Sequence, residues 1–108
     1  MRRGELYRVR RPPGDTKPAR TFVIVSRQAL VDSVYPTVVC APVFTSRHGL
    51  PTQVSVGADE GLKHDSAIHC DSLTSLEKAR LTDFVGALSP TKLRELEIAL
   101  ANALEVSP

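Results

Sequence analysis

Cysteine and long apolar runs are both scarce in this chain of 108 residues, and each shortage excludes a class of protein. Only two cysteines occur, Cys40 and Cys70, each beside apolar residues typical of strands, so we interpret them as core residues in a reducing compartment. Neither a Cys-x-x-Cys motif nor a Cys/His cluster is present, and we expect no metal and no cofactor. Because the N-terminus lacks a signal-peptide apolar region and no run has the length that a bilayer requires, we expect a cytoplasmic protein without membrane contact.

The composition is that of one domain, residues 1–108, with 42% hydrophobic residues to form a modest core. Charge is distributed unevenly: residues 1–27 hold eight Lys/Arg against two acidic residues, a net charge of +6, which leaves −4 for the rest. A basic first quarter predicts an anionic partner that binds one face. A solvated basic edge that only keeps the protein soluble is the alternative.

The most informative segment is 36–47, an apolar, β-branched run that ends in Thr45, Ser46 and Arg47. Such a run predicts a strand buried on both faces, with its polar end held at the rim of the sheet. Pro42 cannot donate a hydrogen bond to a neighbouring strand, so we expect a bulge or an edge position there. Shorter segments predict further strands at 5–10, 21–26, 52–56, 66–73 and 83–88, and a helical turn at 76–81.

One helix is predicted, over residues 90–104. Ser89 is a good N-cap, Pro90 suits the first helical position, and Leu88 and Leu93 have the spacing of a hydrophobic staple. Apolar residues recur every three or four positions and give the helix one apolar face. Five to six strands plus this helix predict an α+β fold, a small curled antiparallel β-barrel.

The ordered set of segments resembles the MazF/PemK family of toxins from toxin–antitoxin systems. The segments that carry this likeness are 4–9 (Gly-Glu-Leu-Tyr-Arg-Val), Arg20 before Phe-Val-Ile-Val-Ser, 41–46 (Ala-Pro-Val-Phe-Thr-Ser), 50–54 (Leu-Pro-Thr-Gln-Val), 61–68 (Gly-Leu-Lys-His-Asp-Ser-Ala-Ile), 80–86 (Arg-Leu-Thr-Asp-Phe-Val-Gly) and the Leu-rich helix. The resemblance covers about residues 4–104.

The resemblance implies an SH3-like barrel, also similar to the CcdB toxins, and a homodimer. It implies a metal-independent endoribonuclease that cuts single-stranded RNA at short sequences and so inhibits translation and growth. It also implies a cognate antitoxin, with a DNA-binding head and a disordered acidic tail that occupies the RNA groove.

Carried over by position, the family's catalytic arginine falls on Arg20 and its catalytic threonine on Thr45. Phe44 is an additional residue before the threonine, so either Thr45 or Ser46 supplies the hydroxyl. Where many members have Glu-Gln-Ile-Arg on the fifth strand, this chain has Asp-Ser-Leu-Thr at 71–74. An arginine and a glutamine that could bind RNA are therefore absent.

These residue types suit RNA cleavage because RNA carries its own nucleophile, the 2′-hydroxyl. Arg20 can stabilise the charge on the phosphorane through bidentate hydrogen bonds, and a hydroxyl can orient the phosphate. The expected products are a 2′,3′-cyclic phosphate and a 5′-hydroxyl. Histidine is the residue that commonly transfers protons near neutral pH, so His48, His64 and His69 are candidates for proton transfer or for contacts to RNA. Each could instead be an ordinary surface or strand residue, and the general base stays open.

The remaining candidates are contacts to RNA. Phosphate contacts are expected from Arg10, Arg11, Lys17, Arg27, Arg47 and Lys63. Asp71 either contacts RNA or pairs with Arg20, and Tyr7 and Phe44 either stack on bases or belong to the core. Two other functions fit the same segments: a CcdB-like poison that grips DNA gyrase, and an SH3-like module that binds RNA without cutting it.

Overall fold

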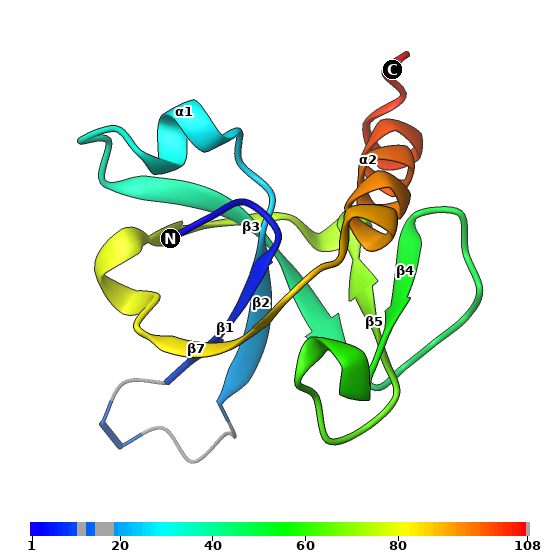
Figure 1. Ribbon diagram of the computed structural model, residues 1–108, viewed down its shortest axis with the longest axis horizontal. Helices are drawn as coiled ribbons and strands as arrows, with labels where there is room; N and C mark the ends of the chain where they lie inside the picture. Colours follow the sequence, from blue (N-terminus) through cyan, green and yellow to red (C-terminus); the bar gives the residue numbers. More distant parts are fainter. Residues whose placement is uncertain (11–12, 15–18, 108) are drawn as a thin grey trace.

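The computed structural model describes residues 1–10, 13–14 and 19–107. Figure 1 shows a curled sheet with one long helix at its side. The elements, in chain order, are β1 (Glu5–Val9), β2 (Arg20–Ile24), α1 (Gln28–Val31), β3 (Thr37–Phe44), β4 (Gln53–Val56), η1 (Ala58–Glu60), β5 (Ser66–His69), η2 (Cys70–Ser72), β6 (Thr74–Glu77), η3 (Lys78–Arg80), β7 (Asp83–Ala87) and α2 (Pro90–Leu104).

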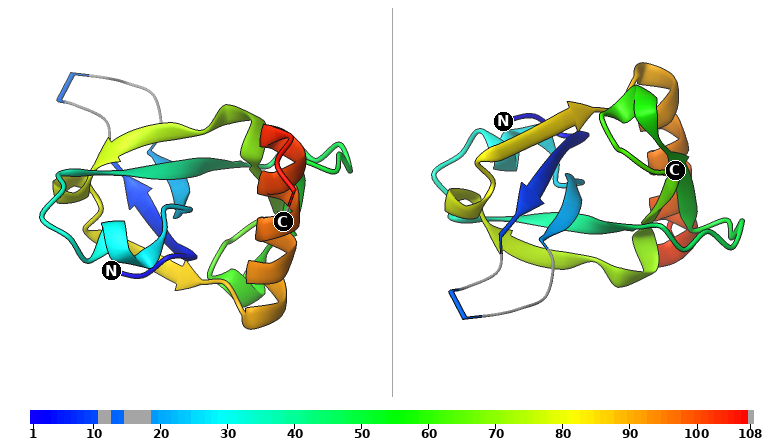
Figure 2. Two further views of the ribbon diagram at one scale, coloured as in Figure 1. Left: turned by 90° about the horizontal axis from the view of Figure 1, so that it is seen from above. Right: turned by 90° about the horizontal axis from the view of Figure 1, so that it is seen from below.

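The strands form one antiparallel sheet in the order β4-β5-β3-β2-β1-β7, with β6 paired to β3 outside this path. Viewed from above and below, the sheet is strongly curled (Figure 2). This confirms the predicted α+β fold, a curled antiparallel half-barrel with a C-terminal helix. No helix in the described part of the chain is long and apolar enough to cross a bilayer.

Both faces of the sheet are buried, because the central strands send alternate residues into two separate cores. The barrel-interior cluster contains Ile24 and Cys40, and the helix-side cluster contains Val23 and Ala41. The predicted central position of β2 and β3 is therefore correct, since a strand that is apolar at every position needs cover on both faces. The two cysteines lie in different clusters and are both free thiols.

The edge of β3 that faces away from β2 is shared by two strands. β6 pairs with β3 over Thr37–Cys40, and β5 pairs with it at Val43 and Phe44. Pro42, which has no N–H to donate, falls in the gap between them, while its pairing with β2 stays in register. The expected edge-like position is therefore found, but the expected bulge is not.

Strand β6 is the element that the sequence prediction missed. We expected one strand at 66–73; instead β5 ends at His69, η2 interrupts it, and β6 runs along β3 to Glu77. The expected helical turn at 76–81 is found in part, as the short helix η3 at Lys78–Arg80. Residues 74–77 contain a single apolar residue, Leu76, so their pairing is set by β3 and not by a local pattern. Within the described residues the sheet consequently has seven strands instead of five to six.

Helix α2 has the predicted bounds, 90–104, and the predicted cap: the Ser89 hydroxyl accepts a hydrogen bond of 3.1 Å from the Lys92 main-chain N–H. Its buried residues, Leu96 and Ala99, join the helix-side cluster and pack over β4 and η2. The helix thereby covers one face of the sheet (Figure 1). We call the side of the barrel that carries the two hollows lined by Arg20 its open end.

Candidate functional site

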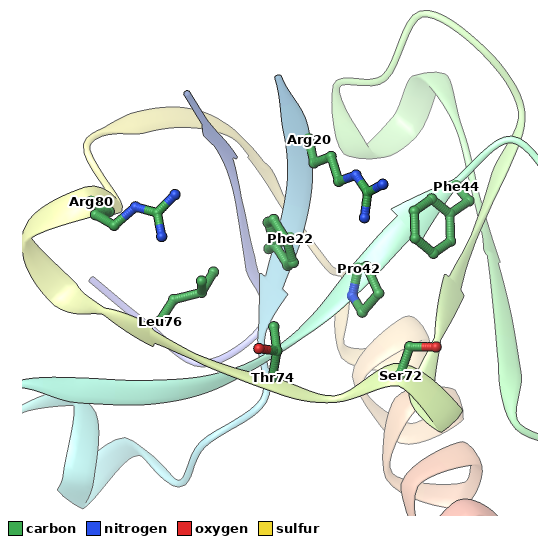
Figure 3. Close-up of a pocket in the computed structure, with 8 residues that line it drawn as sticks. All are labelled: Arg20, Phe22, Pro42, Phe44, Ser72, Thr74, Leu76 and Arg80. Atoms are coloured by element: carbon green, nitrogen blue, oxygen red, sulfur yellow. The ribbon is translucent and has the colours of Figure 1, made fainter. Parts of the chain in front are cut away.

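Arg20 lies at the open end of the barrel, as the exposed first residue of β2. Residues 22 and 24 of the same strand belong to the barrel-interior side, so Arg20 leaves the strand from that face. Its guanidinium carbon lies 5.3 Å from the centroid of the Phe44 ring, in cation–π geometry (Figure 3). Arg20 also lines two separate hollows, which makes it the point where they meet.

The first hollow, which we call the Arg80 hollow, has a volume of about 420 Å³. Its lining is Arg20, Phe22, Pro42, Phe44, Ser72, Thr74, Leu76 and Arg80. Arg20 and Arg80 extend into it from opposite sides, with Phe22 between them (Figure 3). The floor lies at Pro42, where the gap between β5 and β6 leaves β3 uncovered. Two guanidinium groups and two hydroxyls on an apolar floor suit an anionic ligand with flat apolar parts.

The second hollow, the His64 hollow, has a volume of about 460 Å³. Its polar and charged lining comes from four segments: Arg8, Arg20, Thr21, Thr45, Lys63, His64 and Ser66. Three of these residues are permanent cations. The hollow is therefore electropositive, and three hydroxyls and one imidazole also line it.

Thr45 and Ser46 are placed differently with respect to Arg20. Thr45 lies on the same face of the sheet as Val43, and both line the His64 hollow. Phe44, between them in the chain, faces the Arg80 hollow on the other side of the sheet. Ser46 is exposed, and its main-chain carbonyl lies 2.9 Å from Nε2 of His69. Arg20 and Thr45 thus line the same hollow. Ser46 instead contacts His69, through its main-chain carbonyl.

The three histidines differ in their surroundings. His64 lines the His64 hollow with Thr45. His48 is exposed in the loop after β3, where its main-chain N–H donates to the Gln53 side chain at 3.0 Å. His69 is half-buried, bonded to the Ser46 carbonyl and in edge-to-face contact with Phe44 at 4.9 Å between ring centroids. Of these, His64 alone lines a hollow with Arg20.

The remaining predicted RNA contacts are scattered. Arg47 lies in another hollow, among Asp59, Glu60, Asp65 and Lys92, and Arg27 lines one near Tyr35. The Arg10 carbonyl accepts a hydrogen bond of 3.5 Å from Arg80, beside the Arg80 hollow. Arg11 and Lys17 lie outside the described residues. The structure therefore brings Arg20, Thr45, Lys63 and His64 together and leaves Arg27 and Arg47 elsewhere.

The Asp71 carboxylate is hydrogen-bonded to Thr52, a residue of the turn before β4. Its Oδ2 accepts a hydrogen bond of 2.6 Å from the Thr52 hydroxyl, which ties η2 to the turn before β4. This contact gives the carboxylate a structural partner. Within the described residues, no group of three His, Cys, Asp or Glu side chains is arranged to hold a metal ion.

Sequence reasoning did not assign a role to six polar or charged residues that line the two hollows: Arg8, Thr21, Ser66, Ser72, Thr74 and Arg80. Arg80 had a detectable signal, because it stands just before a strand as Arg20 does. Ser72 and Thr74 stand in the segment where the resemblance places RNA-binding residues, but their position beside Pro42 depends on the interruption between β5 and β6.

The fold and the two cationic hollows together define the class of protein: a small curled antiparallel half-barrel with a C-terminal helix and an electropositive open end. Residues 2–104 match the family model described as the PemK-like, MazF-like toxin of type II toxin–antitoxin systems. The chain belongs to this family.

The chain is 30% identical over 102 residues to the endoribonuclease MazF4 of Mycobacterium tuberculosis, which covers 94% of this chain and 90% of the relative. It is 31% identical over 88 residues to the endoribonuclease MazF3 of the same organism, and this match covers 82% of this chain and 84% of the relative.

Two solved structures are similar over almost the whole chain. One is an endoribonuclease in complex with its cognate antitoxin, from a Mycobacterial species; its TM-score is 0.84 at 29% identity, covering 100% of this chain and 98% of that one. The other is the Mycobacterium tuberculosis toxin MazF-mt6, with a TM-score of 0.83 at 25% identity. That match covers 96% of this chain and 99% of the other.

Proposed function

We propose that this protein is the toxin of a type II toxin–antitoxin pair and acts as an endoribonuclease on single-stranded RNA without a metal ion. The observation that carries the proposal is the position of Arg20 between two electropositive hollows, one of which also presents the Thr45 hydroxyl. A strand of RNA laid across this rim would bring a phosphate to the guanidinium. The names of the relatives, endoribonucleases MazF3 and MazF4, support the same activity.

In the proposed reaction the 2′-oxygen attacks the adjacent phosphorus, and the bond from phosphorus to the 5′-oxygen breaks. The 2′-hydroxyl loses its proton to a base, and the departing 5′-oxygen gains one, giving a 2′,3′-cyclic phosphate and a 5′-hydroxyl. Arg20 stabilises the negative charge on the non-bridging oxygens, where charge develops in the transition state. Thr45 holds the phosphate in line for attack.

His64 is the histidine best placed for proton transfer, because it lines the hollow that Arg20 and Thr45 share. Replacing His64 with alanine should slow cleavage, and free imidazole in the buffer should restore part of the rate. Cleavage by the alanine variant at the wild-type rate would assign proton transfer to another group.

The experiment that tests the function is cleavage of a labelled single-stranded RNA by purified protein in EDTA. We expect cleavage, and we expect Arg20→Ala to abolish it while the circular dichroism spectrum stays unchanged. Thr45→Val keeps the side-chain shape and removes the hydroxyl, so it should lower the rate; Ser46→Ala is its matched control. If Ser46→Ala is the damaging change, the threonine assignment is wrong.

Two other outcomes would replace the proposal. RNA binding without cleavage, under conditions that include divalent metal, would indicate a non-catalytic RNA-binding module. Growth arrest that depends on DNA gyrase, with no RNA cut, would indicate a CcdB-like poison. Cleavage that EDTA removes would leave the nuclease but reject the metal-free mechanism.

Two partners belong to the proposal. The first is a second copy of this chain, since one small barrel offers a narrow surface for several nucleotides; light scattering at the mass of one 11.8 kDa chain would count against it. The second is a cognate antitoxin, a partner that the similar endoribonuclease solved with its cognate antitoxin supports. We expect this antitoxin to cover the cationic hollows with an acidic tail. The adjacent reading frame should then encode a DNA-binding head and an acidic tail.

A further inference from the structure

Four groups form a continuous series of contacts at the open end of the barrel. The Arg20 guanidinium carbon lies 5.3 Å from the centroid of Phe44, and the Phe44 ring meets the His69 ring edge to face at 4.9 Å and 77°. His69 then bonds to the carbonyl of Ser46 through Nε2 at 2.9 Å. The series therefore begins at the proposed catalytic arginine and ends on the main chain of β3's polar exit.

Arg20 needs such support because it is an exposed residue with a long, rotamer-rich side chain at the first position of its strand. An arginine that must become ordered as charge develops on the phosphate loses conformational entropy on the way to the transition state. A ring face that already holds the guanidinium reduces this loss, since the cation is attracted to the π-face. Phe44 supplies that face, and Figure 3 shows it directly beside Arg20.

Phe44 in turn is the last residue of β3, where a side chain would otherwise be held on one side only. His69 restrains it twice. The imidazole packs on the edge of the ring, and its hydrogen bond ties β5 to the main chain two residues beyond Phe44. Because a carbonyl oxygen only accepts, Nε2 of His69 carries the hydrogen and is occupied in this contact.

We propose that Phe44 and His69 are positioning residues, which hold the Arg20 guanidinium at the mouth of the Arg80 hollow. This inference rests on the proposed function for its effect on cleavage, but the order of the Arg20 side chain can be measured without it. It assigns the ring at position 44 to the arginine and not to a base of the RNA. It also assigns His69 a structural hydrogen bond instead of a proton transfer.

The first test needs no substrate. Nuclear magnetic resonance of the arginine Nε–Hε groups reports the order of each guanidinium in the free protein. We expect a lower order parameter for Arg20 in Phe44→Leu, and one close to wild type in Phe44→Tyr, which keeps the ring. His69→Gln keeps an N–H donor but loses the ring, and should loosen Arg20 less than Phe44→Leu does. An Arg20 signal as mobile in the wild type as in Phe44→Leu would overturn the proposal.

The second test uses cleavage kinetics on a short single-stranded RNA. Phe44→Leu should lower kcat by roughly three- to ten-fold with little change in KM, the scale of a cation–π contact. In an Arg20→Ala background, whose own RNA affinity is measured first, adding Phe44→Leu should not weaken that affinity further. A rise in KM instead, or an equal loss of affinity in both backgrounds, would show that Phe44 contacts RNA itself and would reject the positioning role.

The two failures are distinguishable. If the wild-type protein cuts no RNA, the proposed function fails while the Arg20 order parameter still decides the contact series. If it cuts RNA and Phe44→Leu cuts at the same rate, the function stands and the positioning role is rejected. Urea unfolding of each variant separates these effects from a loss of folded protein.

Discussion

Gly61 and Gly86 hold η1 and β7 in backbone contact. A Cβ on Gly86 would lie 2.1 Å from the Glu60 carbonyl oxygen, and a Cβ on Gly61 would lie 2.3 Å from the Val85 carbonyl oxygen. Gly61 also has φ of +90°, which side chains disfavour. The segment that begins at Gly61 continues into Lys63 and His64, so this contact fixes one wall of the His64 hollow.

Gly86→Ala should therefore displace this wall. The added methyl meets a main-chain carbonyl that cannot rotate away, and we expect the free energy of unfolding to fall by about 1–3 kcal/mol, the usual cost of overpacking. RNA cleavage should fall as well, because Lys63 and His64 move relative to Arg20. Urea unfolding and a cleavage assay measure the two effects.

Gly49→Ala is the matched control. Gly49 has φ of +64° but a Cβ there would meet nothing within 4 Å. It should cost roughly 1 kcal/mol of stability through backbone strain and leave cleavage unchanged. Equal losses of activity in the two variants would show that the contact between Gly61 and Gly86 does not matter for the site.

RNA binding should depend on salt in proportion to the phosphates that the site contacts. If Arg8, Arg20 and Lys63 each neutralise one phosphate, the plot of log affinity against log salt has a slope of about −2, at about −0.7 per phosphate of a single strand. Lys63→Ala should reduce the slope by roughly 0.7. The control is Lys92→Ala, which removes a cation paired at 3.6 Å with Glu95 on α2. An equal change in both slopes would mean that net charge, and not this hollow, attracts the RNA.

The buried thiols predict how stability changes with pH. Burial raises the pKa of Cys40 from 9.0 to about 12, and burial followed by the nearby Asp71 charge raises the pKa of Cys70 from 9.0 to about 11. Above pH 9 the unfolded chain releases protons that the folded chain keeps, so the free energy of unfolding is fully retained below pH 9 and falls as pH rises above it. Urea unfolding at pH 8, 9 and 10 measures this decline.

Cys40→Ala and Cys70→Ala provide the comparison, since each should be less stable at pH 8 but lose less stability between pH 8 and pH 10. Both thiols should also react slowly with a thiol reagent in the folded protein and rapidly in urea, because the thiolate is the reactive form. Fast labelling of the folded protein would contradict the burial of these residues.

The cap of α2 makes a prediction about stability alone. Ser89→Ala removes the acceptor of the 3.1 Å bond from Lys92 N–H and should lower the free energy of unfolding by about 1 kcal/mol. Ser89→Asp keeps an acceptor and should stay close to wild type. Neither change should alter RNA cleavage, since Ser89 lies in neither hollow. If Ser89→Asp lowered the free energy of unfolding as much as Ser89→Ala does, the hydroxyl would not be acting as a cap acceptor.

The elements that local chemistry specifies were predictable. The apolar run that contains Val38 and Ala41 must be covered on both faces, and the cap at Ser89 with Pro90 after it marks a helix start. Arg20 at the start of a buried strand was recognisable as a rim residue. Strand β6 was missed because its pairing partner lies more than thirty residues earlier in the chain.

The sequence by itself determined which segments are buried, where α2 begins, and that cations gather in the first quarter of the chain. Tertiary structure alone decided that Arg80 faces Arg20, that the Phe44 ring lies against the Arg20 guanidinium, and that Gly61 meets Gly86. The physical reason is that burial and capping depend on neighbours within a few positions, whereas these contacts depend on how strands far apart in the chain pair and curl.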